Sequence, residues 1–181
     1  QKGRDLYDSE VAFVDQHVGR LLDFVEQSGL APRTAVVVTS DHGESFGEND
    51  MWRHGYELWE TLVRVPLIVS VPGVAARRVV ERRSTIDLAP TLLELFGLPL
   101  PSGDDALSGR SLVADLAGRA SAAARPIFVD MSAGPYNEDR QALIVDDFKI
   151  ITSSGRLIGI YDYPSLMDVS AITPLWMTAR W

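Results

Sequence analysis

Apolar residues recur at helical spacing near the start of the chain and form short unbroken runs further on. Residues 8–28 carry an apolar stripe and are followed by Gly29, which commonly ends helices, so we expect an amphipathic helix that covers a sheet. The stripe consists of Val11, Val14, Val18, Leu21, Leu22 and Val25. The run at residues 34–39 predicts a strand buried on both faces, and residues 66–71 predict a second strand. Strands that alternate with helices favour a mainly parallel sheet.

The second half of the chain mixes one helix with several short strands. Asp87 is expected to cap a helix over residues 88–96, which Gly97 ends. Short apolar runs broken by Gly, Asp and Ser then predict a small antiparallel β subdomain. The expected organisation is an α/β domain at residues 1–125, the β subdomain at 126–163, and a tail of unassigned role at 164–181.

Candidate chemistry lies where the first apolar run ends. Asp41 and His42 follow it directly, and loops at the carboxyl ends of strands present side chains without disturbing the core. A carboxylate beside an imidazole offers a hard oxygen and a borderline nitrogen, a pair that suits divalent cations. His54 opens a second His-Gly pair a short way downstream, and its neighbours Trp52, Tyr56 and Trp59 are expected to shield it from water. Asp41 and His42 also fit a plain polar turn after a strand. The pair by itself therefore leaves both a metal site and a structural turn open.

The residues around this pair carry a more specific pattern. Residues 39–73, TSDHGESFGENDMWRHGYELWETLVRVPLIVSVPG, closely resemble the sulfatase family of the alkaline phosphatase superfamily in both order and spacing. Similar segments lie outside that block, at residues 7–22, 86–97, 109–112 and 148–150. The resemblance extends from about Tyr7 to Asp162 and corresponds to the C-terminal portion of such an enzyme.

The resemblance implies a fold, an activity and a set of site residues. The expected fold is the C-terminal half of an alkaline-phosphatase-like α/β sandwich, with a mainly parallel sheet covered by helices and the small antiparallel subdomain. By resemblance, Asp41 and His42 bind a divalent metal, while His54 contacts the sulfate or protonates the leaving oxygen. The family points to calcium, and the imidazole of His42 leaves manganese and zinc open. Glu44 and Glu48 are interpreted as solvated residues or as carboxylates that orient a ligating imidazole.

The implied function is metal-dependent hydrolysis of sulfate esters, and the chain is expected to be a fragment. Sulfatases carry their nucleophile upstream, in a Cys/Ser-x-Pro/Ala-x-Arg motif, together with two further acidic ligands. This chain contains no cysteine, and we assign it no nucleophile, so the isolated chain is expected to be inactive. One alternative is a phosphodiesterase or phosphoethanolamine transferase of the same superfamily, and another is a non-catalytic binding module.

Charge and composition narrow the partners. The net charge of −8 argues against nucleic acid as a ligand, because nucleic-acid binding needs a basic footprint. No run of 18 apolar residues predicts a membrane span. The expected partners are a small sulfated substrate and the N-terminal half of the enzyme. Neither the absence of cysteine nor the start of the sequence indicates a compartment.

Overall fold

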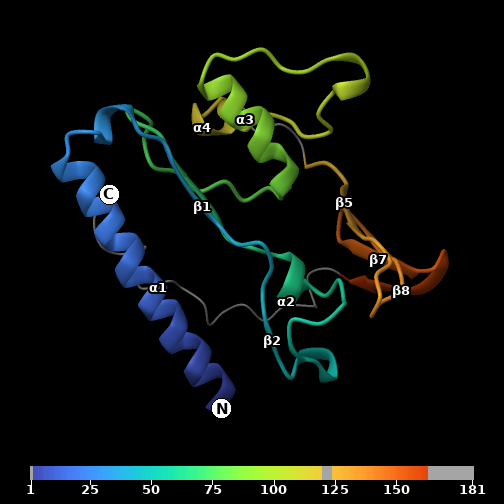
Figure 1. Ribbon diagram of the computed structural model, residues 1–181. Coiled ribbons are helices and arrows are strands. Elements are labelled where there is room, and N and C mark those ends of the chain that lie inside the picture. The colour runs from blue at the N-terminus through green and yellow to red at the C-terminus, as the bar shows by residue number, and fades with distance from the viewer. Residues whose placement is uncertain (1, 120–123, 163–181) are drawn as a thin grey trace. The chain divides into compact units, whose positions relative to one another are not determined.

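The structure is a computed structural model that describes residues 2–119 and 124–162 (Figure 1). The chain divides into two compact units, residues 1–74 and residues 75–181, and each is described by itself. The predicted tail at residues 164–181 lies outside the described residues. The domain limits predicted at residues 125 and 163 stay a prediction. Within the described ranges, no helix combines the length and the apolar character needed to cross a bilayer.

A long helix begins the first unit. Helix α1 (Lys2–Gln27) starts earlier than expected. It is followed, as predicted, by Gly29, which has a φ of 66°. A glycine adopts this value without steric cost. The N–H of Leu30 then donates to the carbonyl of Val25 at 3.0 Å, which closes the helix end. A short 3-10 turn, η1 (Ala31–Arg33), leads into the strand β1 (Val36–Thr39).

The strand β1 pairs with β4 (Leu67–Ser70), the second strand expected from the sequence. The two run antiparallel, with Val38 opposite Ile68, and most of their residues are half-buried. The parallel pairing and the full burial expected for this part are therefore not found in the described residues, whose strand pairs are all antiparallel. An apolar run indicates that a strand is shielded from water, but it does not say in which direction its neighbour runs.

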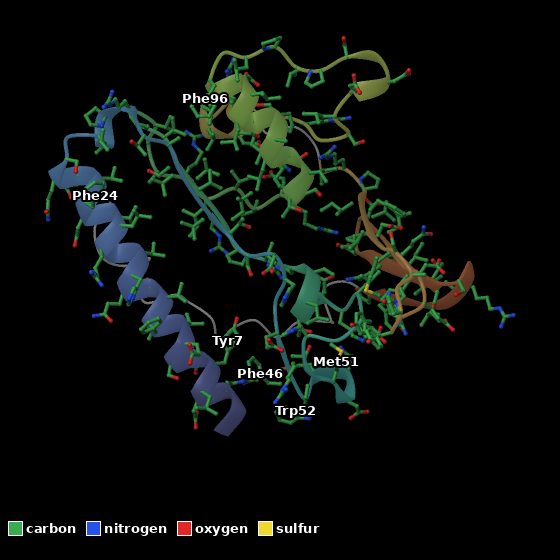
Figure 2. All side chains as sticks on the ribbon, in the orientation of Figure 1. Tyr7, Phe24, Phe46, Met51, Trp52 and Phe96 are labelled. Atoms are coloured by element: carbon green, nitrogen blue, oxygen red, sulfur yellow. The ribbon has the colours of Figure 1, made fainter. Side chains whose placement is uncertain are left out.

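Helix α1 leaves much of its apolar surface open to solvent. Val14, Leu21 and Phe24 are 57%, 61% and 59% exposed, and Phe24 is labelled in Figure 2. Near the start of the helix, Tyr7 makes an edge-to-face contact with Phe46 at a centroid distance of 5.1 Å. Val14 and Leu21 belong to the predicted stripe, so its expected role as a cover for the sheet is not seen at these two positions.

The segment between β1 and β4 forms a small ribbon followed by a short helix. Its elements are β2 (Ser45–Phe46), η2 (Glu48–Asp50), β3 (Trp52–Arg53) and α2 (Glu60–Val63). Strand β2 pairs with β3 so that Ser45 lies opposite Arg53. Leu58 and Leu62 are each only 4% exposed, so α2 and the residues just before it supply apolar burial next to the ribbon.

In the second unit, four strands form an antiparallel meander in the order β5-β6-β7-β8. Their bounds are β5 (Ile127–Met131), β6 (Arg140–Val145), β7 (Phe148–Ser153) and β8 (Arg156–Asp162). Ser154 and Gly155 join β7 to β8 with φ values of 47° and 70°, as a tight hairpin turn requires. The sheet confirms the small antiparallel β structure expected from the broken apolar runs.

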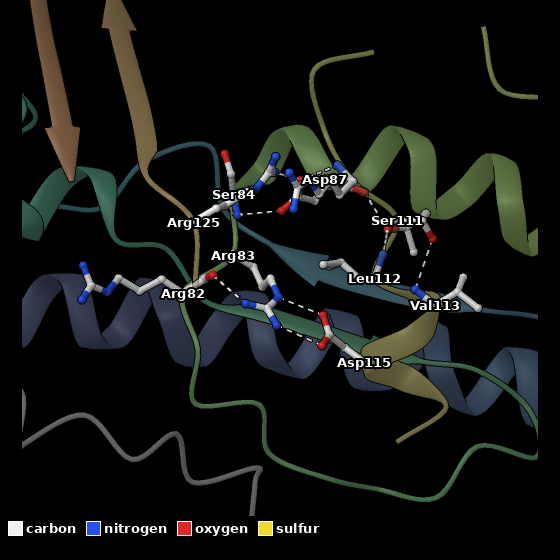
Figure 3. Close-up of polar contacts among 11 residues, drawn as sticks. Arg82, Arg83, Ser84, Asp87, Ser111, Leu112, Val113, Asp115 and Arg125 are labelled. Atoms are coloured by element: carbon white, nitrogen blue, oxygen red, sulfur yellow. Dashed lines mark hydrogen bonds and ion pairs between the residues drawn. The ribbon is translucent and has the colours of Figure 1, made fainter. Parts of the chain in front are cut away.

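The helical part of the second unit is organised around one buried carboxylate. Its elements are η3 (Thr85–Asp87), α3 (Leu88–Leu95), η4 (Gly103–Asp105) and α4 (Val113–Leu116). Asp87 is 1% exposed and accepts the N–H groups of Ser84 at 3.0 Å and of Arg110 at 2.8 Å. It also pairs with the guanidinium of Arg125 (Figure 3).

The predicted role of Asp87 as the cap of the following helix needs correction. Asp87 does occupy the N-cap position of α3, but its side chain makes no capping hydrogen bond there. Ser84 is the N-cap of the turn that precedes α3, and Asp87, at the third position of that turn, completes a capping box with Ser84. Its carboxylate therefore points back toward Ser84 and across to Arg110, which follows α3 in the chain. The sequence pattern places Asp87 at the start of a helix, but it does not show that the first turn begins three residues earlier, at Ser84.

Candidate active site

The candidate site lies on the loop that leaves β1, residues 40–44, which we call the site loop. The hydroxyl of Thr39 donates to the carbonyl of Pro66 at 2.8 Å, so the end of β1 is tied to the start of β4. Asp41, His42 and Glu44 follow within five residues of Thr39. The site loop then continues into β2, whose partner β3 directly precedes His54.

Asp41 presents an ionised carboxylate to solvent. Its side chain is 88% exposed, and its Oδ1 accepts the N–H of His42 at 3.0 Å. Hydrogen bonds from the backbone N–H groups of His42 and of Asp41 itself lower the pKa of the Asp41 carboxyl below its usual value. The group therefore remains anionic at neutral pH.

His42 is oriented by the loop itself. Its Nδ1 lies 2.8 Å from the carbonyl oxygen of Gly43. A carbonyl only accepts, so in a neutral imidazole Nδ1 carries the proton and Nε2 keeps its lone pair. That is the arrangement in which a histidine binds a metal through Nε2, with a backbone acceptor holding the other nitrogen.

The donor atoms of Asp41 and His42 fit a shared cation. The Nε2 of His42 lies 3.8 Å from Oδ2 of Asp41. Two ligands on one ion at bond lengths of roughly 2.0 to 2.4 Å are separated by less than about 4.8 Å, so this spacing suits a common metal. The described residues contain no group of three or more His, Cys, Asp or Glu placed to hold a metal ion, so the pair offers only part of a coordination sphere.

His54 lies beside His42, although the two are twelve positions apart. Their ring centroids are 4.6 Å apart with an angle of 38° between the planes. The Nδ1 of His54 lies 3.0 Å from Oε2 of Glu44, which is a charge-assisted contact when the imidazole is protonated. The structure thus places all three predicted site residues, Asp41, His42 and His54, on neighbouring parts of one loop system in the first unit.

Backbone contacts with α2 hold the site loop in place. The N–H of Gly43 donates to the carbonyl of Leu62 at 2.7 Å, and a Cβ on Gly43 would come within 2.0 Å of the Thr61 carbonyl oxygen. Only glycine allows this close approach. Two residues on, the buried hydroxyl of Ser45 lies 2.6 Å from that of Thr61. The loop between Asp41 and His54 is therefore anchored on both backbone and side-chain contacts.

Glu48, the second carboxylate considered with Glu44, serves another contact. It pairs with Arg4 at 2.8 Å and accepts the N–H of Phe46. Partial burial acts to raise the pKa of the Glu48 carboxyl, but hydrogen bonds from backbone N–H groups and the Arg4 charge lower it overall. Glu48 thus links the ribbon to the start of α1 and does not orient an imidazole.

Two of the three aromatic residues expected to shield His54 are largely exposed. Trp52 and Tyr56 are 61% and 52% exposed, and the His54 side chain itself is 61% exposed. Trp52 instead lines a hollow of about 420 Å³ together with Phe46, Arg4 and Asp5. Trp52 and Phe46 are labelled in Figure 2. Among the described residues, His54 is therefore open to solvent, and the predicted shielding by these two aromatics is not observed.

His17 and a motif-like segment at residues 121–125 are two further sequence features with candidate chemistry. The Nδ1 of His17 lies 3.0 Å from the carbonyl oxygen of Phe13 on its own helix, α1. The letters of the Ser-x-Ala-x-Arg pattern do occur once, at residues 121–125, but after β1 and not before it. Arg125 there pairs with the buried Asp87, and Ser121 lies outside the described residues. We assign neither His17 nor the segment at residues 121–125 to the site.

Sequence comparison identifies relatives over much of this chain. It is 31% identical over 113 residues to a choline-sulfatase of Rhizobium meliloti, a match that covers 62% of this chain and 22% of that protein. It is 38% identical over 135 residues to the steryl-sulfatase of Mus musculus, covering 65% of this chain and 22% of the relative. The chain therefore spans about a fifth of the length of these relatives.

Solved structures agree with the sequence matches. A structure with D-glucosamine-2-N,6-O-disulfate described as its substrate superposes with a TM-score of 0.69 at 29% identity, over 86% of this chain and 33% of that one. The structure of a 2-O GAG sulfatase gives a TM-score of 0.74 at 22% identity, over 91% of this chain and 37% of that one. The second likeness concerns the fold alone, and together they confirm the expected alkaline-phosphatase-like α/β class.

The family model named Sulfatase matches residues 2–98, which include β1, the site loop and His54. That range is more than half of the 181 residues. It contains every residue that the sequence pattern singled out for chemistry. The chain belongs to the sulfatase family.

Proposed function

We propose that this chain supplies Asp41, His42 and His54 to the active site of an enzyme that hydrolyses a sulfate ester with a divalent metal. The observation that carries the proposal is the cluster itself. The Nε2 of His42 is 3.8 Å from an Asp41 oxygen, and the His54 ring is 4.6 Å from the His42 ring. Two candidate ligands and one candidate proton-transfer group thus share one exposed surface.

The proposed roles follow from the chemistry of each side chain. Asp41 contributes an anionic oxygen whose lowered pKa keeps it charged, and His42 contributes Nε2 because its Nδ1 faces a carbonyl. His54, solvent-accessible beside them, contacts the sulfate group or gives a proton to the leaving alcohol oxygen. A divalent metal held there supplies Lewis-acid stabilisation of charge on the ester oxygens. Calcium is the proposed metal, and manganese and zinc are the alternatives.

The rest of the site is proposed to come from sequence outside these 181 residues. The chain has no cysteine to serve as the nucleophile, and its aligned part covers only 22% of the choline-sulfatase and 22% of the steryl-sulfatase. A cation that prefers six to eight oxygen ligands, or four in a tetrahedral set, needs more than Asp41 and His42. The substrate class proposed is a small sulfated compound, as the names of the relatives suggest.

We expect the 181-residue chain to bind a divalent cation weakly and only through Asp41 and His42. Affinity falls with the number of charged ligands, and weak calcium sites have dissociation constants of about 10⁻⁴ to 10⁻³ M, so a two-ligand site is expected at that weak end. Titration with Mn²⁺ should broaden the NMR signals of His42 strongly and those of His17, on helix α1, hardly at all. Asp41→Ala should remove the effect, whereas Asp104→Ala in the exposed loop should not. Broadening that persists in Asp41→Ala would show that the metal lies elsewhere.

Activity is tested by grafting, because the isolated chain is expected not to release sulfate. The segment of the Rhizobium meliloti choline-sulfatase that aligns with this chain is replaced by the corresponding residues of this chain, and sulfate release from choline sulfate is measured. A graft that melts like the parent enzyme should release sulfate in a metal-dependent way, and Asp41→Ala in the graft should abolish it. A graft that folds and binds metal but releases no sulfate would refute the proposed function. Sulfate release that is unchanged by Asp41→Ala would refute it as well.

A further inference from the structure

Glu44 is the residue of the site loop whose contacts the proposed roles do not use. Its side chain is 18% exposed, although the residue it contacts, His54, is 61% exposed. One carboxylate oxygen, Oε2, lies 3.0 Å from Nδ1 of His54. The other, Oε1, is buried and has no hydrogen-bond partner in the described residues. From the sequence, Glu44 is interpreted as either a solvated residue or a carboxylate that orients an imidazole. A half-buried carboxylate with one oxygen directed to an exposed imidazole does not fit the first of these interpretations.

The location of Glu44 follows from the ribbon that carries it. Glu44 directly precedes Ser45, and His54 directly follows Arg53, the residue that pairs with Ser45. The register of the two strands therefore brings Glu44 and His54 to adjoining positions at the end of the ribbon. Ser45 is fully buried against Thr61, which keeps the backbone of Glu44 close to α2. The carboxylate is thus held before any ligand arrives.

We propose that Glu44 is a positioning residue that fixes the tautomer and the orientation of His54, so that Nε2 is the nitrogen that exchanges a proton with the substrate. A carboxylate only accepts hydrogen bonds, so a neutral His54 imidazole beside Glu44 carries its proton on Nδ1. The Nε2 atom then has the free lone pair in the neutral ring and carries the transferable proton in the cationic ring. This inference rests on the role proposed above for His54, but its test does not depend on turnover.

The neighbouring histidine supports the same arrangement. The His42 ring lies against the His54 ring at 4.6 Å, and its own Nδ1 faces the Gly43 carbonyl. Both imidazoles of the site therefore have Nδ1 engaged by an acceptor of the site loop and Nε2 left for a ligand. Acceptors of this kind set the tautomer of catalytic and metal-binding histidines in general, and their loss typically costs about 10- to 100-fold in affinity or activity.

The tautomer of each histidine can be read directly in the 181-residue chain. The chain is labelled with ¹⁵N at histidine, and the shifts of Nδ1 and Nε2 are measured at about pH 8.5, two units above the usual imidazole pKa. The proposal expects His54 to carry its proton on Nδ1 in the unmodified protein. A His54 protonated mainly on Nε2 in the unmodified protein would overturn the proposal without any variant.

Variants then ask whether Glu44 is the cause. Glu44→Ala should move His54 from mostly Nδ1-protonated toward the ratio of free histidine, while His17 and His42 keep their shifts. Glu44→Met removes the acceptor but fills the half-buried space, so it should give the same shift if the alanine variant is unstable. Glu26→Ala, an exposed carboxylate on helix α1, is the matched control and should change nothing. An unchanged His54 tautomer in folded Glu44→Ala or Glu44→Met overturns the proposal, whether or not the chain takes part in sulfate hydrolysis.

Discussion

Replacing Asp87 with alanine is expected to lower the free energy of unfolding of the second unit by about 3–5 kcal/mol. Asp87 is 1% exposed and accepts from the N–H of Ser84, the N–H of Arg110 and the guanidinium of Arg125 (Figure 3). Alanine would leave all three donors without this acceptor in a region with little access to water. The loss is a large share of the roughly 5–15 kcal/mol that stabilises a typical domain.

Urea denaturation followed by circular dichroism measures this loss, and hydrogen exchange at the Ser84 and Arg110 amides locates it. Asp104→Ala, an exposed carboxylate of the same unit, is the control and should change the unfolding free energy by no more than about 0.5 kcal/mol. Asp87→Asn should have an intermediate effect, because the amide keeps one acceptor oxygen. A loss below about 1 kcal/mol in Asp87→Ala would mean that water replaces the carboxylate and that the network contributes little.

Replacing His54 with alanine in the grafted enzyme is expected to lower turnover by about 100-fold or more, a typical contribution of a positioned acid or base. His54 is 61% exposed, and its only described hydrogen bond is the one to Glu44, so the fold has little to lose. The melting temperature and the metal content should therefore stay close to those of the unmodified graft. Sulfate release and metal content are measured on the same preparation.

His17→Ala is the matched control, because the His17 side chain hydrogen-bonds to the carbonyl of Phe13 within its own helix. It should leave turnover unchanged. If His54→Ala retains most of the activity, or loses activity only in step with stability, His54 is a structural residue of the loop. The group that protonates the leaving oxygen would then lie outside this chain.

Much of the secondary structure was predictable because its signals are local. Gly29 with its φ of 66° ends the helix that the stripe of valines and leucines predicts. The two-residue link Ser154-Gly155 makes the hairpin that the broken apolar runs suggest. The direction of pairing between β1 and β4 was not predictable in this way, because the hydrogen bonds that define it join residues about thirty positions apart.

Candidate ligands were also predictable, since Asp41 and His42 are neighbours in sequence and directly follow a strand. Their separation of 3.8 Å is therefore nearly a local property. The roles of the nearby carboxylates were not. Glu44 and Glu48 look equivalent along the chain, yet one contacts His54 and the other Arg4. Which carboxylate meets the imidazole depends on the register of β2 with β3.

Family, candidate ligands and most helix and strand positions can be read from the order of residues, because each rests on neighbours or on short periodic patterns. The meeting of His42 with His54, the contact of Glu44 with His54 and the burial of Asp87 depend on how distant segments pack. The register of β2 with β3 brings the two histidines and Glu44 together. The hydrogen bonds of Arg110 and Leu112 to Asp87 and Thr91 bury the Asp87 carboxylate. No local sequence pattern encodes these contacts. Chemistry at this site thus requires both a recognisable loop and the packing that holds it.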